Sequence, residues 1–198
     1  MNNSLKIKRM VGIASLAAIV AVLQIIANYI TFGPVSITLA LIPLIIGAIL
    51  YGPTGGALLG SLMGIIILTA PSTGSFLAIN PIVTVILCIV KTGAAGAVSG
   101  LLFNLFKKRN MKLAVILASI AAPIVNTGLF AIGSILFFLP TIQVWAGEGT
   151  SAYAYLFFTM IGTNFIIEFV INSVLSPVVL YIVKIISSNF NMGTNLEK

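Results

Sequence analysis

Long apolar segments separated by short polar ones dominate the chain. An α-helix rises about 1.5 Å per residue, so about 20 apolar residues are needed to cross the hydrocarbon of a bilayer. Six segments meet or approach that length, and we expect each to be a transmembrane helix. They are residues 10–30, 35–51, 55–70, 80–106, 111–139 and 153–187. The segments 31–36, 71–79 and 140–151 are then expected to be loops on the outer side of the membrane.

The second and third segments are short, and only the turn signal Gly52-Pro53 separates them. They could also form one hairpin that fails to cross, but the charges favour two crossings. With six spans, every basic cluster lies on one side and the opposite loops carry only Glu148. The positive-inside rule then places both termini in the cytoplasm. The clusters are Lys6, Lys8 and Arg9; Lys107, Lys108, Arg109 and Lys112; and Lys184 and Lys198.

The predicted fold class is therefore all-α: a polytopic membrane protein with six transmembrane helices and both termini cytoplasmic. Residues 1–198 are expected to form a single integral membrane domain, with short cytoplasmic tails at about 1–9 and 188–198. The basic start is similar to that of a signal peptide. Its apolar stretch is too long, however, and no clear A-x-A cleavage site follows, so we expect a retained first helix.

Composition narrows the function. The chain is 60% hydrophobic and 7% charged, whereas a soluble domain carries about 25% charged residues. An ordinary soluble enzyme, a disordered protein and a nucleic-acid-binding domain are therefore excluded, and the net charge of +7 encodes orientation. The sequence has no histidine, no aspartate, one cysteine and no P-loop motif. A Ser-His-Asp triad, a histidine metal site, a disulfide and direct use of ATP are thus excluded. We expect no cofactor and a function based on binding.

Small residues recur every four positions, a spacing that places them on one helix face and lets backbones approach closely. For the glycines we expect packing within the bundle. The alanines of the first segment occur in two registers and could pack internally or dock a second protein. The glycines are Gly56, Gly60, Gly64, Gly96 and Gly100; the alanine pairs are Ala14 with Ala18 and Ala17 with Ala21.

Two charges fall at membrane depth, Lys91 in the fourth segment and Glu168 in the sixth. Such charges are costly and face a cavity or a partner. Their depths, roughly 16 Å and 22 Å below the outer ends of their segments, would let the side chains meet. One interpretation is an ion pair that clamps the two helices. The other is that Lys91 meets an anionic group of a ligand. Both remain open.

Asparagines accompany these charges. Asn164, Glu168 and Asn172 form one stripe of the sixth segment. Asn172 lies deep and is expected to join helices, whereas Asn80, Asn126 and Asn164 lie in the outer half, where a ligand would arrive. Aromatic residues near the outer ends either mark the membrane interface or line a ligand lid. These aromatic residues are Phe32, Phe76, Trp145 and Tyr153. We include Phe76 and Trp145 among the candidate ligand contacts.

Taken together, these features resemble the substrate-binding membrane subunit, or S component, of energy-coupling factor (ECF) vitamin transporters. The resemblance rests on chain size, six spans, and the Ala14/Ala18 face. It rests also on the segment 41–53 leading into the glycine-rich 55–60, and on Asn80-Pro81 opening the fourth span. Lys91 stands where relatives often have arginine. The sixth span is similar to that of the family in the placement of Asn164, Glu168, Asn172 and Pro177.

The resemblance implies a subunit that captures a vitamin from outside with high affinity, in a bacterial cell membrane. It implies docking through Ala14 and Ala18 on a membrane scaffold subunit that works with two cytoplasmic ATPases. Pantothenate suits a site with one lysine and several amides, because it carries a carboxylate, an amide and hydroxyls; overall similarity also leans toward the pantothenate type. Folate and riboflavin are flat ligands that favour aromatic stacking, and they remain alternatives.

Two other classes compete with this interpretation. A self-sufficient small secondary transporter or channel would predict inverted repeats, and the two halves show no convincing match. A membrane enzyme would rest on Glu168 and Lys91 as acid and base, and no further catalytic constellation supports it.

Overall fold

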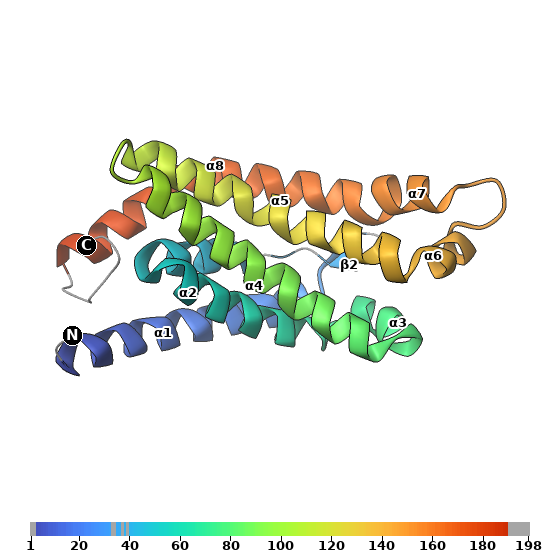
Figure 1. The fold of residues 1–198 in the computed structure, drawn as a ribbon, viewed down its shortest axis with the longest axis horizontal. Coiled ribbons are helices and arrows are strands. Elements are labelled where there is room, and N and C mark those ends of the chain that lie inside the picture. The colour runs from blue at the N-terminus through green and yellow to red at the C-terminus, as the bar shows by residue number, and fades with distance from the viewer. Residues whose placement is uncertain (1–2, 33–34, 37, 39, 190–198) are drawn as a thin grey trace.

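The computed structural model describes residues 3–32, 35–36, 38 and 40–189, and the described chain is almost entirely helical (Figure 1). The long helices run roughly along one axis. Two short strands, β1 and β2, pair antiparallel, with Thr31 opposite Ser36 and Phe32 opposite Val35. The elements are α1 (Asn3–Ala27), β1 (Thr31–Phe32), β2 (Val35–Ser36), α2 (Leu41–Ile67), α3 (Pro71–Ile79), α4 (Pro81–Phe106), α5 (Met111–Phe137), α6 (Leu139–Ala146), α7 (Ala152–Ala154), the π-helix η1 (Tyr155–Gly162) and α8 (Thr163–Asn189).

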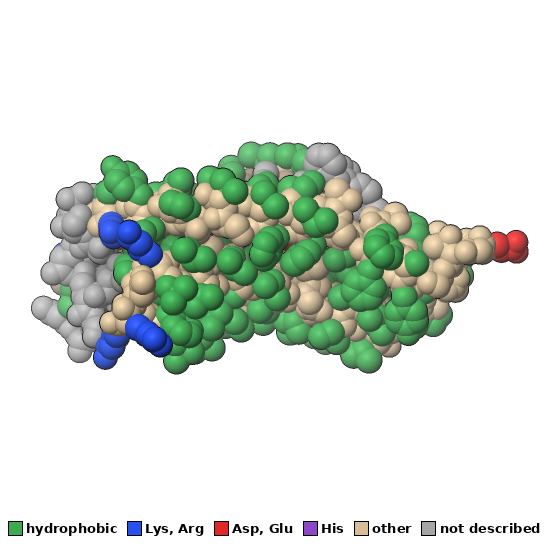
Figure 2. All heavy atoms as spheres, turned by 90° about the horizontal axis from the view of Figure 1, so that it is seen from above, with side chains coloured by type: hydrophobic (Ala, Val, Ile, Leu, Met, Phe, Trp, Pro, Cys, Tyr) green, Lys and Arg blue, Asp and Glu red, His purple; other side chains and the backbone are tan. Residues whose placement is uncertain are grey.

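Five helical segments of the described chain are long and apolar enough to cross a membrane. They are Asn3–Ala27, Leu41–Ile67, Pro81–Phe106, Met111–Phe137 and Ala152–Ile186. Apolar side chains cover the length of the molecule between its two ends, as Figure 2 shows for one face. The expectation of an all-helical, multi-pass protein is thereby confirmed. The number of crossings depends on α2, which contains both the second and the third predicted segments.

Helix α2 is broken at Gly52, whose φ of 78° and ψ of −175° are not helical. A positive φ is accessible to glycine without a Cβ clash. The two arms, residues 41–51 and 53–67, then fold back on one another. A Cβ added at Gly56 would lie 2.7 Å from the Cβ of Ala48, and one added at Gly47 would meet Leu59. In a straight helix these pairs would be two or more turns apart. The Gly52-Pro53 turn signal therefore marks a helical hairpin, and six crossings remain a prediction.

The second arm of α2 packs on α4 through glycines that bring the two backbones together. A Cβ at Gly96 would lie 2.5 Å from the carbonyl carbon of Gly56, and one at Gly60 would lie 2.7 Å from that of Thr92. One at Gly64 would lie 2.5 Å from the carbonyl oxygen of Cys88. These contacts run antiparallel along both helices. We call them the glycine seam, and they confirm the prediction of packing within the bundle.

The two ends of the molecule differ in charge. The start of α1, the end of α8 and the α4–α5 turn lie at one end, and α3 and α6 lie at the other (Figure 1). Basic side chains gather at the first end, and an acidic side chain marks the opposite tip (Figure 2). Arg9 donates a hydrogen bond of 2.7 Å to the Tyr51 carbonyl, so the tip of the α2 hairpin lies at the basic end.

Two segments predicted as loops contain helices. Residues 71–79 form α3, and residues 139–146 form α6. Both helices have proline within their first two positions, where its fixed φ suits a helix and its missing N–H costs no hydrogen bond. The third predicted loop, residues 31–36, contains the short β1–β2 pair. The end of the molecule opposite the basic clusters therefore contains more regular secondary structure than the polar pattern predicted.

Candidate functional site

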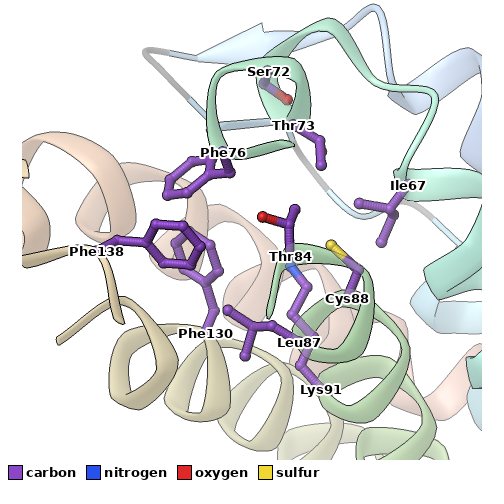
Figure 3. Close-up of a pocket in the computed structure, with 10 residues that line it drawn as sticks. All are labelled: Ile67, Ser72, Thr73, Phe76, Thr84, Leu87, Cys88, Lys91, Phe130 and Phe138. Carbon is purple, nitrogen blue, oxygen red and sulfur yellow. The ribbon is translucent and has the colours of Figure 1, made fainter. Parts of the chain in front are cut away.

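Two cavities open in the half of the bundle that lies away from the basic end. The first, which we call the aromatic chamber, has a volume of about 460 Å³ and lies between α3, α4 and α5. Three phenylalanine rings form one of its walls, and Cys88 faces them from the other side (Figure 3). Its lining residues are Ile67, Ser72, Thr73, Phe76, Thr84, Leu87, Cys88, Lys91, Phe130 and Phe138.

The second cavity, which we call the amide chamber, has a volume of about 330 Å³. It lies between α4, α5, η1 and α8, and its wall carries most of the polar side chains predicted for a ligand site. Its lining residues are Thr38, Lys91, Asn126, Thr127, Phe130, Met160, Ile161, Asn164, Phe165 and Glu168. Both volumes include space that is open to solvent.

Lys91 and Phe130 line both chambers, so they stand at the junction between them. Lys91 is 8% exposed, and its ammonium lies 4.8 Å from the centre of the Phe130 ring. Figure 3 shows its side chain extending along α4 toward Thr84. Within the part of the chain that the structure describes, this ammonium forms no hydrogen bond and no ion pair. Glu168 lines the same chamber and attracts this ammonium electrostatically without forming an ion pair with it. A buried ammonium without a hydrogen bond is costly, and direct contact with an anion would stabilise it.

Glu168 is 4% exposed. Its carboxylate interacts with Thr38 and with the Asn126 side chain, and Lys91 attracts it electrostatically. The carboxylate accepts a hydrogen bond of 2.7 Å from the Thr38 N–H. Among the described residues, Lys91 and Glu168 therefore share the wall of the amide chamber without forming the ion pair that one interpretation of the sequence expected. The bond instead places Thr38, which precedes α2, on the wall of the amide chamber.

The amides of the chamber contribute both donors and acceptors. Asn126 is buried, and its Oδ1 has no hydrogen-bond partner among the described residues. Asn164 donates a hydrogen bond of 3.3 Å from Nδ2 to the Met160 carbonyl, one turn before it. Asn126 lines the chamber beside Glu168, and its Oδ1 can accept a hydrogen bond from a ligand. Such a group binds a hydroxyl or an amide better than an apolar surface.

Phe76 and Trp145, the two aromatic candidates, lie in one cluster. The Phe76 ring packs edge-to-face on Phe138 at 5.2 Å, on Trp145 at 5.3 Å and on Phe130 at 5.8 Å. Phe76 lines the aromatic chamber, whereas Trp145 lies behind it and lines neither chamber. Trp145 therefore supports the wall, and the chamber surface itself is made by phenylalanines.

Asn80 and Asn172 serve the helices. Asn80 is the N-cap of α4, where its Oδ1 accepts a hydrogen bond of 3.1 Å from the Val83 N–H, and it lines neither chamber. Its predicted ligand contact remains a prediction. Within α8, Asn172 Nδ2 donates a hydrogen bond of 2.7 Å to the Glu168 carbonyl. Asn172 also lies outside both chambers.

Several chamber residues were not singled out from the sequence. Ser72 and Thr73 lie in residues 71–79, which were expected to form a loop, although Pro71 is a helix-start signal. Thr84 lies in the predicted fourth segment and had no pattern signal. Phe130 stands one helical turn after Asn126, so the same helix face could have identified it. Cys88 was noted only as the single cysteine. Thr38 precedes α2 and had no pattern signal.

The two alanine registers of α1 differ in exposure. Ala14 and Ala18 are exposed, in line with large exposed apolar side chains such as Val11 and Val22, whereas Ala17 and Ala21 are partly buried. The buried side of the helix carries Gly12, Val20, Gln24 and Ala27. A small-residue face at Ala14 and Ala18 is therefore left uncovered by this chain. The second register packs partly within the bundle.

The fold is that of a multi-pass membrane protein, with two cavities in one half of its helical bundle. The sequence matches the family of the substrate-specific component of ECF transporters over residues 8–180. The chain belongs to this family. No curated protein and no solved structure matches the sequence significantly. The family consists of the substrate-specific subunits of transporters rather than of enzymes.

Proposed function

We propose that this chain is the high-affinity substrate-binding subunit of an ECF-type vitamin importer and that its vitamin is pantothenate. In this proposal the subunit lies in a bacterial cell membrane and crosses it six times, with both termini in the cytoplasm. It works with a membrane scaffold subunit and two cytoplasmic ATPases that supply the energy. The observation that carries the proposal is Lys91, a buried cation without an ion-pair partner in the described chain, at the junction of two chambers lined by polar and aromatic side chains.

The chemistry of the two chambers suits the parts of pantothenate. Its carboxylate would form a charge-assisted hydrogen bond with Lys91, the strongest type available in the site. Its amide and hydroxyls suit Asn126 and Asn164 on the wall of the amide chamber. The branched methyl groups suit the Phe130 ring between the chambers. A ligand with these three parts satisfies the cation, the amides and the apolar surface together.

Six crossings are supported by the α2 hairpin. Its tip bonds to Arg9, and a Cβ added at Gly100 would lie 2.7 Å from the Pro53 nitrogen. Arg9 and Gly100 both lie close to the basic end of the bundle, so the hairpin reaches the side that carries the cationic clusters. By the positive-inside rule this side is cytoplasmic. A first arm of residues 41–51 covers only about 16 Å, so this crossing would be completed by the segment before it.

The exposed Ala14 and Ala18 support docking of α1 on the scaffold subunit, because small residues allow close approach of another helix. Ala14→Trp or Ala18→Trp should leave vitamin binding by the isolated chain unchanged and abolish uptake by the reconstituted complex. Ala17→Trp, on the partly buried side, should instead lower the melting temperature of the isolated chain. Normal uptake by both exposed variants would show that the partner docks elsewhere.

A flat vitamin such as riboflavin or folate is the second candidate, because three phenylalanine rings line the aromatic chamber. These rings already pack edge-to-face on each other, which leaves less face available for stacking. Calorimetric titration of the purified chain against a panel of vitamins separates the candidates. We expect pantothenate to bind with the highest affinity. Tight binding of riboflavin or folate without binding of pantothenate would overturn the assignment.

The same preparation tests the class of transporter. In proteoliposomes, the chain alone should not accumulate the vitamin, and uptake should require the scaffold, both ATPases and ATP. Accumulation by the chain alone would instead identify a self-sufficient transporter.

A further inference from the structure

The first turn of α3 forms part of the wall of the aromatic chamber. Pro71 begins the helix, and Ser72 and Thr73 of its first turn line the chamber. The N-cap residue, Ala70, provides no side-chain hydrogen bond to the first turn. The N–H groups at a helix start carry a partial positive charge and bind anions when nothing else satisfies them. Pro71 has no N–H, and the Thr73 N–H donates to the Ala70 carbonyl at 3.0 Å, so of these first three residues Ser72 has the N–H that can bind an anion. This helix is nine residues long, and its start faces a cavity.

Two hydroxyl donors stand beside these N–H groups. Within the described chain, neither the Ser72 nor the Thr73 hydroxyl makes a hydrogen bond, and Thr73 is buried. The third hydroxyl of the chamber is different, because Thr84 Oγ1 donates its proton to the Asn80 carbonyl at 2.8 Å. Ser72 and Thr73 can therefore each donate to a ligand without losing a bond to the protein.

Lys91 provides the full positive charge, independently of the helix start. Lys91 is buried, with 8% of its surface exposed, and it forms no hydrogen bond or ion pair in the described chain. In Figure 3 its side chain extends from α4 into the chamber, while Ser72 and Thr73 enter from α3 on the opposite side. The space between a buried ammonium and two hydroxyls at a helix start is suited to a single anionic group.

We infer that Lys91, Ser72, Thr73 and the start of α3 form a carboxylate pocket inside the aromatic chamber. The inference rests on the proposed function and deepens it by naming where the anionic end of the ligand binds. The carboxylate lies between Lys91 and the first turn of α3. The apolar part of the ligand then packs on Phe76 and Phe130, and a polar end that passes Phe130 reaches the amides of the second chamber.

Charge balance selects a carboxylate rather than a phosphate. The pocket holds one positive side chain, Lys91, and the acid Glu168 lines the adjoining chamber. A carboxylate brings a single negative charge, which matches the single positive charge of the pocket. A phosphate monoester carries close to two at pH 7, so it would place a second negative charge near Glu168 with no further cation to compensate it.

The test uses 3-phenylpropionate and its neutral amide, 3-phenylpropanamide, as a matched pair of probes on the full chain. Binding is followed by the fluorescence of Trp145, the only tryptophan, which packs on the chamber residue Phe76. Protection of Cys88, the only cysteine and a chamber residue, from alkylation by N-ethylmaleimide gives an independent measurement. We expect the acid to bind about tenfold or more tightly than the amide, because only the acid forms charge-assisted hydrogen bonds.

Variants test whether the preference for the acid probe over the amide probe arises from this pocket. The double variant Ser72→Ala/Thr73→Val should weaken binding of the acid about tenfold and leave binding of the amide unchanged. Lys91→Met should remove the preference for the acid. Thr127→Val, which changes a hydroxyl that lines only the amide chamber, is the matched control and should keep the preference. Equal responses to acid and amide, including no response to either, or a preference that survives in the double variant, would overturn the inference.

Titration of the same variants with pantothenate distinguishes the two proposals. If the wild type binds pantothenate and the Ser72→Ala/Thr73→Val variant binds it equally well, the carboxylate pocket is wrong and the proposed vitamin stands. If the acid probe behaves as expected and pantothenate does not bind, the pocket stands and the vitamin is a different carboxylate.

Discussion

Helix α4 is packed in two contrasting ways along its length. Toward the basic end, Gly96 and Gly100 meet the backbone of α2 with no room for a side chain. Toward the other end, the same helix lines both chambers with Thr84, Cys88 and Lys91. Close backbone packing fixes the helix, and the space left beyond it is available to a ligand. The glycine seam therefore positions Lys91, whereas the chamber walls on α4 are made by the side chains of Thr84, Cys88 and Lys91.

The largest expected effect comes from filling the seam. Gly96→Ala places a methyl group against the Gly56 backbone, which cannot move aside as a flexible side chain would, and should lower the free energy of unfolding by about 3 kcal/mol. Gly128→Ala is the matched control, because a Cβ there has nothing within 4 Å in a helix of the same bundle. Thermal unfolding in nanodiscs measures both. Equal melting temperatures for the two variants would contradict the account of the seam.

Removing the cation should affect binding strongly and stability little. Lys91→Met should weaken pantothenate binding about 100-fold, because a buried charge-assisted contact is lost. The ligand-free variant should be at least as stable as the wild type, because a buried cation without an ion-pair partner has been removed. Calorimetry and thermal unfolding measure the two effects. A marked loss of stability would instead support an ion pair with Glu168.

A substitution in the wall of the amide chamber should weaken pantothenate binding less than Lys91→Met does. Asn126→Leu should lower pantothenate affinity about tenfold, because one neutral hydrogen bond to the ligand is lost and a polar group of the ligand remains unsatisfied. Asn172→Leu is the comparison variant on α8, outside both chambers, and should leave the affinity unchanged in those molecules that fold. An unchanged affinity for Asn126→Leu would remove this residue from the site.

The smallest expected effect is that of Asn80→Ala, which tests whether Asn80 caps α4 or contacts the ligand. Asn80→Ala removes the cap of α4 and should cost about 1 kcal/mol of stability. The affinity for pantothenate should stay within about twofold of the wild type, since Asn80 lines neither chamber. Asn80→Asp keeps an oxygen that can accept from Val83 N–H and should restore stability. A tenfold loss of affinity for Asn80→Ala would restore Asn80 to the ligand site.

The hydrophobic pattern alone predicted most of the fold. It located the helical segments, and glycine spacing predicted close packing within the bundle, which the structure shows between Gly56 and Gly96. The pattern did not find α3 and α6, because short helices among polar residues have no long apolar period. It also could not place Thr38 against Glu168, since that hydrogen bond joins segments 130 residues apart.

The candidate site was predicted in part. Lys91, Asn126, Asn164 and Glu168 were singled out because polar groups at membrane depth are costly, and the structure brings all four to one chamber. Whether Lys91 pairs with Glu168 or is available to a ligand depends on the direction of their side chains, which helix periodicity does not give. The aromatic chamber depends on rings from α3, α5 and the turn after α5, which only the tertiary structure brings together.

The central claim is that Lys91 binds the carboxylate of the ligand. Calorimetric titration of wild type and Lys91→Met with pantothenate and with panthenol, in which an alcohol replaces the carboxylate, tests it most directly. We expect the wild type to prefer pantothenate by about 100-fold and Lys91→Met to bind the two compounds about equally. The same preference for pantothenate in both proteins, or no preference in the wild type, would contradict the claim.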